Sequence, residues 1–359
     1  MLTTVLAHVS VLTLCGLSVA QDLGVPLSWR KFNNTRPTSE RISISQNAIN
    51  TILPQLDAST GQFNGIGYWQ AANAFSAMAL QDQVAKTTTN KDVVVKNLKL
   101  VFGLWKNYDQ FGVITATQAQ ARKSPFKNFT LAGTCDGVTM AGGVFWRPTT
   151  DDTAINSITT GLSAYLFETT SDPKYLSAAT LSASWLKAHN IASSSSSNPG
   201  ILLDTEDGAT CARSPASWLF TYNSGKFVEG LSVLAGVTGN SEWSQLMLTT
   251  VAAAVKNAPW QGSNGIITEG ASTDSNNDSV GFKAIFIRGL REAFRRTPQN
   301  NSLRILIHSY VDVQYNALLD LASTGNEYSA NWLGPKPAGF TSWGQLAALD
   351  VLVAAVEAN

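Results

Sequence analysis

Apolar residues recur at helical spacing along nearly the whole chain, and this pattern most constrains the fold. In residues 39–56, Ile42, Ile49 and Ile52 lie mostly on one side of a helix. Similar spacing predicts helices over 68–84, 93–108, 154–168, 175–189, 226–237, 242–257, 282–294, 303–321 and 343–356. The sequence therefore predicts an all-α fold of about ten helices.

Short turns join most of these helices in pairs. Residues 170–173 combine a helix stop, an Asp that can cap and a Pro suited to the first helical position. Comparable breaks occur at 238–240 and 297–299. Alternation of short turns with long loops favours a toroid of helical hairpins whose long loops gather at one mouth. A solenoid is the competing interpretation, but no motif repeats at a fixed period.

The first twenty residues resemble a secretory signal peptide. A long apolar run is followed by the small residues Ser18, Val19 and Ala20 before Gln21. A membrane anchor is the alternative, but the run is short and contains polar residues. The C-terminus lacks the tail of a lipid-anchor signal. We expect a soluble, secreted protein whose residues 21–359 form a single domain, because no linker-like break divides them.

Two cysteines remain after signal removal, Cys135 and Cys211. In an oxidising compartment they predict one disulfide, which would stabilise the fold by about 4–5 kcal/mol through loop closure. Two isolated buried thiols are the alternative. Four N-glycosylation sequons agree with export, although such triplets also occur by chance. They begin at Asn33, Asn128, Asn277 and Asn300.

Charge and composition argue against several kinds of partner. The net charge is zero and charged residues make up 14% of the chain, so no basic stripe favours nucleic acid. Such a surface suits a neutral polysaccharide better than a polyanion. No His/Cys/carboxylate cluster has metal-ligand spacing, and no nucleotide-binding glycine motif is present. We expect a monomer with no metal, no cofactor and no membrane span.

Residues 204–231 combine acids, a cysteine and large aromatic side chains in one link between helices. Trp218, Phe220 and Tyr222 stand beside Asn223 and Gly225. Loops with flat side chains and fixed polar groups often carry binding sites. The alternative is a helix entry with a disulfide cysteine and buried aromatic residues, and composition alone leaves both open.

Several blocks, in order, resemble glycoside hydrolase family 76, the secreted α-1,6-mannanases of fungi and bacteria. The blocks are GIGYWQAAN (65–73), CDGVTMAGGVFW (135–146), AINSITTGLSAYLFETTSDPKYL (154–176), Asp207-Gly208 with Cys211, WLFTYNSG (218–225), GIITE (265–269) and FKAIFIRGL (282–290). The resemblance implies an (α/α)6 barrel of twelve helices. It also implies an endo-α-1,6-mannanase that acts on cell-wall mannan.

The same resemblance implies a set of sugar-binding residues. Aromatic faces stack on pyranose rings, while amides, carboxylates and ammonium groups bond the hydroxyls. By analogy with matching family positions, the expected substrate-binding residues are Trp146, Asp207, Tyr222, Asn223 and Lys283. Core packing is the competing interpretation for each tryptophan. Arg288 is expected to be a structural ion-pair partner.

The sequence departs from the family at its catalytic centre, an adjacent pair of aspartates. Between the early tryptophan block and Cys135, the sequence has only the isolated Asp82, Asp92 and Asp109. The family has twelve helices, and the two that are not predicted fall in this interval. Either the lineage has lost this segment or the sequence read from the gene is incomplete.

The tandem Asp151-Asp152 lies at a predicted helix start, where acids cap the helix and favour its dipole. The catalytic residues are therefore unassigned. Spare acids are Asp136, Asp204, Glu206, Asp207, Glu229 and Glu269. The leading expectation is a mannanase, the second is a mannan-binding protein without catalysis, and the third is a structural wall protein.

Overall fold

The computed structural model describes residues 22–104, 127–147, 149–156, 158, 160–215, 217–256, 259–270 and 278–358. These residues contain ten α-helices, in agreement with the predicted number. They are α1 (Thr38–Ile52), α2 (Tyr68–Ala85), α3 (Lys91–Leu104), α5 (Thr160–Thr170), α6 (Pro173–His189), α7 (Thr221–Thr238), α8 (Ser241–Lys256), α9 (Ser279–Arg296), α10 (Asn301–Leu321) and α11 (Ser342–Glu357).

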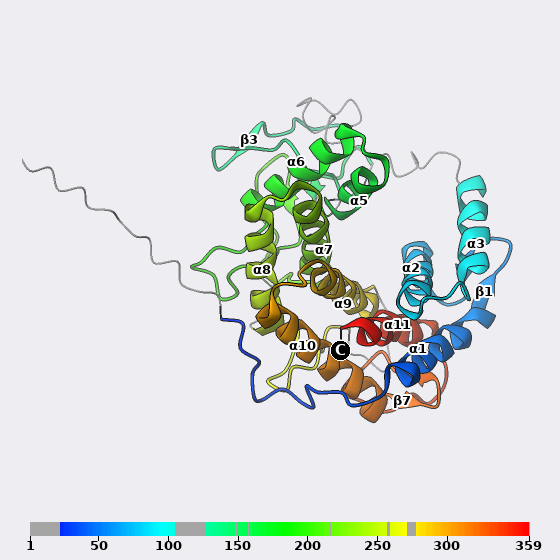
Figure 1. Ribbon diagram of the computed structural model, residues 1–359. Coiled ribbons are helices and arrows are strands. Elements are labelled where there is room, and N and C mark those ends of the chain that lie inside the picture. Colours follow the sequence, from blue (N-terminus) through cyan, green and yellow to red (C-terminus); the bar gives the residue numbers. More distant parts are fainter. Residues whose placement is uncertain are drawn as a thin grey trace, which may run out of the picture.

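The helices lie in an inner and an outer row (Figure 1). Helices α5, α7, α9, α11 and α2 are neighbours in that order, and α6, α8, α10 and α1 pack outside them. Helices α7, α9 and α11 are buried on nearly all sides. The sequence of α11 is largely apolar, as such burial requires, whereas α9 also buries charged residues. The predicted toroid of helical hairpins is confirmed for the described part of the chain.

Long segments lead into the inner helices, and most of them carry a short antiparallel ribbon. The ribbons pair β1 (Leu56–Asp57) with β2 (Gln62–Phe63), β3 (Thr134–Cys135) with β4 (Val138–Thr139), β5 (Ala154–Ile155) with β6 (Glu206–Asp207), and β7 (Ser323–Thr324) with β8 (Glu327–Tyr328). Short turns close the other end, as at Ser171-Asp172, where the Asp172 side chain caps α6. The long segments therefore gather at the N-terminal ends of the inner helices, as predicted; we call this end the mouth.

Two glycines bring α7 and α9 unusually close together. A Cβ atom built on Gly289 would lie 2.1 Å from the carbonyl oxygen of Gly225, and one built on Gly225 would lie 2.5 Å from Cα of Phe286. The backbones of α7 and α9 are therefore in direct contact here, and only glycine, which has no Cβ atom, allows so close an approach. For this reason Gly225 lies inside α7 and not in a turn, and the helix begins at Thr221, five residues earlier than predicted.

The predicted helix start at Ala154 is wrong. Ala154 and Ile155 form β5, which pairs with Asp207 and Glu206, and α5 begins only at Thr160. Ile155 is buried in the core through this pairing. The tandem aspartates therefore do not cap a helix. Instead, an Asp152 carboxylate oxygen accepts the N–H of Arg147 at 2.7 Å.

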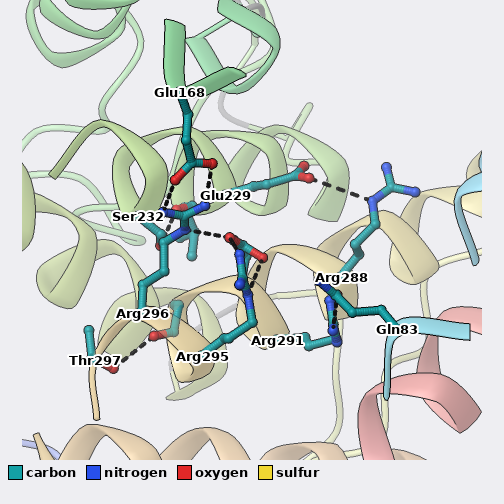
Figure 2. Close-up of polar contacts among 12 residues, drawn as sticks. Gln83, Glu168, Glu229, Ser232, Arg288, Arg291, Arg295, Arg296 and Thr297 are labelled. Atoms are coloured by element: carbon teal, nitrogen blue, oxygen red, sulfur yellow. Dashed lines mark hydrogen bonds and ion pairs between the residues drawn. The ribbon is translucent and has the colours of Figure 1, made fainter. Parts of the chain in front are cut away.

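Charged side chains link the inner helices behind the mouth, and the pairs made by Arg288 are buried while the pair of Arg296 with Glu168 is partly exposed. Figure 2 shows Arg296 of α9 bonded to Glu168 of α5, and Arg288 directed towards Glu229 of α7. The two bonds from Arg296 to Glu168 are 2.8 and 2.9 Å long. Arg288 lies 3.9 Å from Glu229 and 3.6 Å from Asp350 of α11. The prediction that Arg288 is a structural ion-pair partner is confirmed. These contacts fix the positions of α5, α7 and α11 relative to α9.

The predicted disulfide is present and joins Cys135 to Cys211, with Cα atoms 5.5 Å apart. It ties β3 to the loop that follows β6. Directly beneath it, Nδ1 of the buried His189 lies 3.2 Å from the Glu206 carboxylate, and Nε2 lies 3.1 Å from the Thr139 carbonyl oxygen. Both ring nitrogens of His189 therefore face oxygen atoms that can accept a hydrogen bond.

An N-terminal arm of residues 22–37 runs around the outside of α10 (Figure 1, dark blue). Arg30 and Lys31 both bond Asp320 at 2.6 Å, and Asn316 donates to the carbonyl oxygens of Lys31 and Asn33. Trp29 is buried against Tyr310, with ring centroids 5.2 Å apart.

The predicted signal peptide and the sequon at Asn277 lie outside the described residues. Asn33 and Asn128 are exposed. The Asn300 side-chain oxygen accepts the N–H of Leu303 at the start of α10. No helix in the described ranges is long and apolar enough to cross a membrane.

Candidate functional site

Five aromatic side chains meet where the inner helices begin, and we call them the aromatic floor. They are Trp69, Trp146, Phe220, Tyr222 and Phe282. Phe282 of α9 is central, with ring centroids 4.5 Å from Tyr222 of α7 and 5.9 Å from Trp69 of α2. Trp146 lies 6.5 Å from Tyr222 and keeps 52% of its surface exposed. The exposed ring of Trp146 therefore extends the packed aromatic cluster of Tyr222 and Phe282 across the mouth.

A polar network borders the aromatic floor at Asp204. Its Oδ1 accepts the Tyr222 hydroxyl at 2.7 Å and the Asn223 side-chain amide at 2.9 Å. The buried Asn156 donates in turn to the Asn223 side-chain oxygen at 3.1 Å. Burial and the neighbouring Asp204 raise the pKa of Tyr222 well above its usual range, so the phenol stays protonated and remains a donor. The carboxylate of Asp204 is therefore fixed by the first turn of α7.

Glu269 contacts the same turn from the other side. Its carboxylate accepts the backbone N–H of Thr221 at 3.0 Å and also the Thr221 hydroxyl. Burial raises the pKa of Glu269 to about 7, although the Thr221 hydrogen bonds and Lys283 oppose the shift. This carboxyl group is therefore part protonated near neutral pH.

Lys283 is fully buried beside Glu269. Its Nζ donates to the carbonyl oxygens of Glu269, at 3.1 Å, and Ala330, and it lies 4.6 Å from the centre of the Trp332 ring. Burial lowers the pKa of Lys283 to about 7, against the attraction of Glu269. In this structure Lys283 holds the loops around Glu269 together.

The structure separates the six spare acids by environment. Glu206 is buried against His189, Glu229 bonds Lys226 at 2.7 Å inside the bundle, and Asp136 is 82% exposed beside Arg213. Asp204 and Glu269 are the two of the six that bond the first turn of α7 next to the aromatic floor. Within the described residues these two carboxyl groups are the best placed for chemistry at the mouth.

Of the predicted substrate-binding residues, Trp146, Tyr222 and Asn223 lie together, and Lys283 lies beside Glu269. Asp207 is engaged elsewhere, because its carboxylate accepts the Thr153 hydroxyl and the N–H groups of Ala209 and Thr210. Burial alone would raise the pKa of Asp207, but these hydrogen bonds hold it below its usual value. Asp207 shapes its own loop, and its role towards substrate stays a prediction.

The sequence prediction did not include Asn156 or Phe282 in this site, and it named Phe220 only as part of the candidate loop 204–231. Phe282 directly precedes Lys283, and Phe220 lies two residues before Tyr222. An aromatic residue just before a polar helix start is the sequence signal that could have identified both. Asn156 carries no comparable signal, since its place depends on a contact with Asn223, 67 residues further along the chain.

The interval expected to hold tandem aspartates extends into residues 105–126, outside the described residues. Within the described part, Asp82 is buried and accepts the N–H of Asn90 at 2.9 Å, so it closes the turn between α2 and α3. The Asp151-Asp152 loop is held by Lys127, whose Nζ donates to the carbonyl oxygens of Arg147 and Asp152.

The protein is an (α/α)6 toroid. Its candidate site lies on the segments that lead into the inner helices, and short turns join the inner helices to the outer ones. The family model for glycosyl hydrolase family 76 matches residues 126–358. The chain belongs to this family. A comparison of the sequence with curated proteins gave no match.

Solved structures share the fold at low sequence identity. The GH76A α-1,6-mannanase of Salegentibacter sp. HEL1_6 has 16% identity over 90% of this chain and 100% of its own, with a TM-score of 0.70. An inactive variant of that enzyme, with two aspartates replaced, was solved with α-1,6-mannotetrose and gives the same TM-score at 15% identity over 89% of this chain and 99% of its own. Dfg5 from Chaetomium thermophilum, in complex with glucosamine, gives 0.66 at 14% identity, covering 91% and 92% of the two chains.

Proposed function

We propose that this protein is a secreted glycoside hydrolase of endo-α-1,6-mannanase type that acts on mannan of cell walls. The observation that carries the proposal is the aromatic floor with Asp204 and Glu269 on either side of the first α7 turn. Membership of family 76 and the mannooligosaccharides bound by structural neighbours support the same class of substrate.

The chemistry of the mouth suits a neutral sugar polymer. The exposed face of Trp146 can stack on the apolar side of a pyranose ring. Asp204 and the Asn223 amide can accept and donate hydrogen bonds to hydroxyl groups beside it. Fixed polar groups of this kind orient a sugar without strong attraction to polyanions.

Hydrolysis of a glycosidic bond requires a carboxylic acid that gives a proton and a carboxylate that serves as base or nucleophile. We assign the acid to Glu269, because its pKa of about 7 keeps a proton available near neutral pH. Asp204 is the partner carboxylate, since hydrogen bonds from the Tyr222 hydroxyl and the Asn223 amide hold it beside the aromatic floor.

A second candidate function is mannan binding without cleavage. It is favoured by the one tandem aspartate pair in the sequence, Asp151-Asp152, lying in a loop where Asp152 bonds the Arg147 N–H. Such a protein would keep the aromatic floor and lack the family's catalytic pair.

Incubation with linear α-1,6-mannan, followed by a reducing-end assay and a binding titration, separates these functions. New reducing ends support the hydrolase, and saturable binding without them supports the binding protein. If neither signal is seen, both proposals are wrong.

Export is part of the proposal and rests on the signal-like residues 1–20 and the disulfide. The sequons at Asn33 and Asn128 are accessible for glycosylation. Cleavage before Gln21 and glycan-dependent mobility of the secreted protein would be measured by N-terminal sequencing and enzymatic deglycosylation.

A further inference from the structure

A shallow cavity of about 460 Å³, open to solvent, lies at the rim of the mouth between the entrances of α2 and α11. Its walls are Gln55, Asn64 and Gly65 on one side and residues 340–343 on the other. The volume falls in the lower part of the range for small-molecule pockets, roughly 300–1,000 Å³. It can therefore accept a compact ligand or one unit of a polymer.

The wall chemistry favours a neutral, hydroxyl-rich ligand. None of the lining residues is charged, which leaves no group to bind a phosphate or a carboxylate by charge. Phe340 and Trp343 are half-buried and provide aromatic surface. The side-chain amides of Gln55 and Asn64 line the cavity, and each carries donor and acceptor groups that can bond the hydroxyls of a ligand.

Hydrogen bonds hold the two walls in place. The Ser342 hydroxyl donates to the carbonyl oxygen of Asn64, and the N–H of Asn64 donates to the carbonyl oxygen of Gln55 at 2.8 Å. The Thr341 hydroxyl accepts the N–H of Gly344 at 3.1 Å and caps α11. The cavity is thus preformed, and binding requires little rearrangement.

The chain connects the cavity directly with the aromatic floor. Gly65 is followed by Tyr68, which is 36% exposed, and by Trp69, whose ring centroid lies 5.9 Å from that of Phe282. A polymer lying across the floor can therefore pass Tyr68 and reach the cavity along the rim.

We propose that this cavity is an accessory subsite that binds one hexopyranose unit of a neutral chain whose other units occupy the aromatic floor. The Gln55 and Asn64 amides bond its hydroxyl groups, and Phe340 and Trp343 contact its apolar face. This inference rests on the proposed mannan-binding function and adds a second point of attachment for longer chains.

The test is a calorimetric titration of α-1,6-linked mannooligosaccharides of two to six units against the full-length protein. The variants are the double substitution Gln55→Ala with Asn64→Ala, and separately Trp343→Phe, which keeps most of the packing. Gln299→Ala is the matched control, because Gln299 is exposed in the turn at the opposite end of the ring. Thermal melting establishes that each variant is folded.

We expect the double variant to bind the longest oligosaccharides about tenfold more weakly, as expected for losing one or two neutral hydrogen bonds. The shortest oligosaccharides, which occupy only the floor, should bind with unchanged affinity. Equal affinities for wild type and both cavity variants at every length would overturn the subsite and leave mannan binding intact. Absence of binding by the wild type would overturn the proposed function together with the subsite.

Discussion

The Tyr222 hydroxyl donates a 2.7 Å hydrogen bond to Asp204, 18 residues earlier in the chain. This bond joins an inner helix to the loop between α6 and α7, and it places a carboxylate beside the aromatic floor. The loop and the helix start thus form one site, although the sequence presents them as a connector followed by a helix.

Replacing Tyr222 with Phe should weaken mannan binding about tenfold, because Asp204 loses a donor and can rotate away from the floor. The measurement is a binding titration with α-1,6-mannooligosaccharides. Tyr175→Phe, on the outer helix α6, removes a hydroxyl far from the mouth and should leave the affinity unchanged. Equal affinity of the Tyr222 variant and the wild type would show that the Asp204 bond has no role in binding.

Glu269→Gln should lower the rate of mannan hydrolysis by roughly 10²–10⁴-fold, the usual contribution of a general acid, while binding persists. Since the pKa of Glu269 is about 7 and its protonated form is needed, wild-type activity should fall as the pH rises above 7. Reducing-end assays from roughly two pH units below this pKa to roughly two units above it would measure both effects.

The control for Glu269 is Glu242→Gln, which removes a carboxylate that is exposed on α8 and paired with Lys187. It should change neither the rate nor its pH dependence. Retained activity in the Glu269 variant would exclude that residue as the acid.

Asp350→Asn should flatten the dependence of stability on pH. Burial raises the pKa of Asp350 from 3.8 to about 6, against the attraction of Arg288. Because the folded pKa lies above the unfolded value, this group's stabilisation is complete below pH 4 and is lost as the pH rises through 6. The loss amounts to about 3 kcal/mol at about 1.36 kcal/mol per pKa unit.

Urea unfolding at several pH values from acid to neutral would measure this effect. The wild type should lose stability over the interval between the two pKa values of Asp350, and the variant should lose much less. Identical profiles for the two proteins would show that Asp350 titrates normally in the folded state.

Gly289→Ala should destabilise the fold by about 1–3 kcal/mol, the range for overpacking, and nearer the upper end since the obstruction is backbone. The new Cβ would lie 2.1 Å from the Gly225 carbonyl oxygen. Gly103→Ala is the matched control, because a Cβ there meets nothing within 4 Å and Gly103 lies in α3. Thermal and urea unfolding should show a loss for the first variant and a small gain for the second.

Local sequence signals predicted much of the fold and less of the site. Helical periodicity predicted the ten described helices, and the lengths of the intervening loops predicted that the long segments gather at one end. Both predictions succeeded because they depend on residues that are neighbours in the sequence. It failed at Ala154 and Ile155, which became a strand through pairing with Asp207 and Glu206 some fifty residues away. The early start of α7 also depends on a distant partner, the backbone of α9 near Phe286.

For the site, the resemblance to family 76 selected Trp146, Tyr222 and Asn223, which the fold brings together. It selected Asp207 as a substrate-binding residue, whereas Asp204, three residues earlier in the same loop, was only one of the spare acids. The distinction arises because Asp207 bonds the Thr153 hydroxyl and its own loop, while Asp204 bonds the first turn of α7. Such partners are visible only once distant segments have been placed.

The short turns at the end of the ring opposite the mouth have a practical consequence. Gly239 and Pro298 lie in exposed turns between helices, and the groups assigned to sugar binding all lie on segments that enter the inner helices. A fusion partner or a surface linker attached at either turn would therefore present every immobilised molecule with its mouth facing the solution, ready to capture polysaccharide.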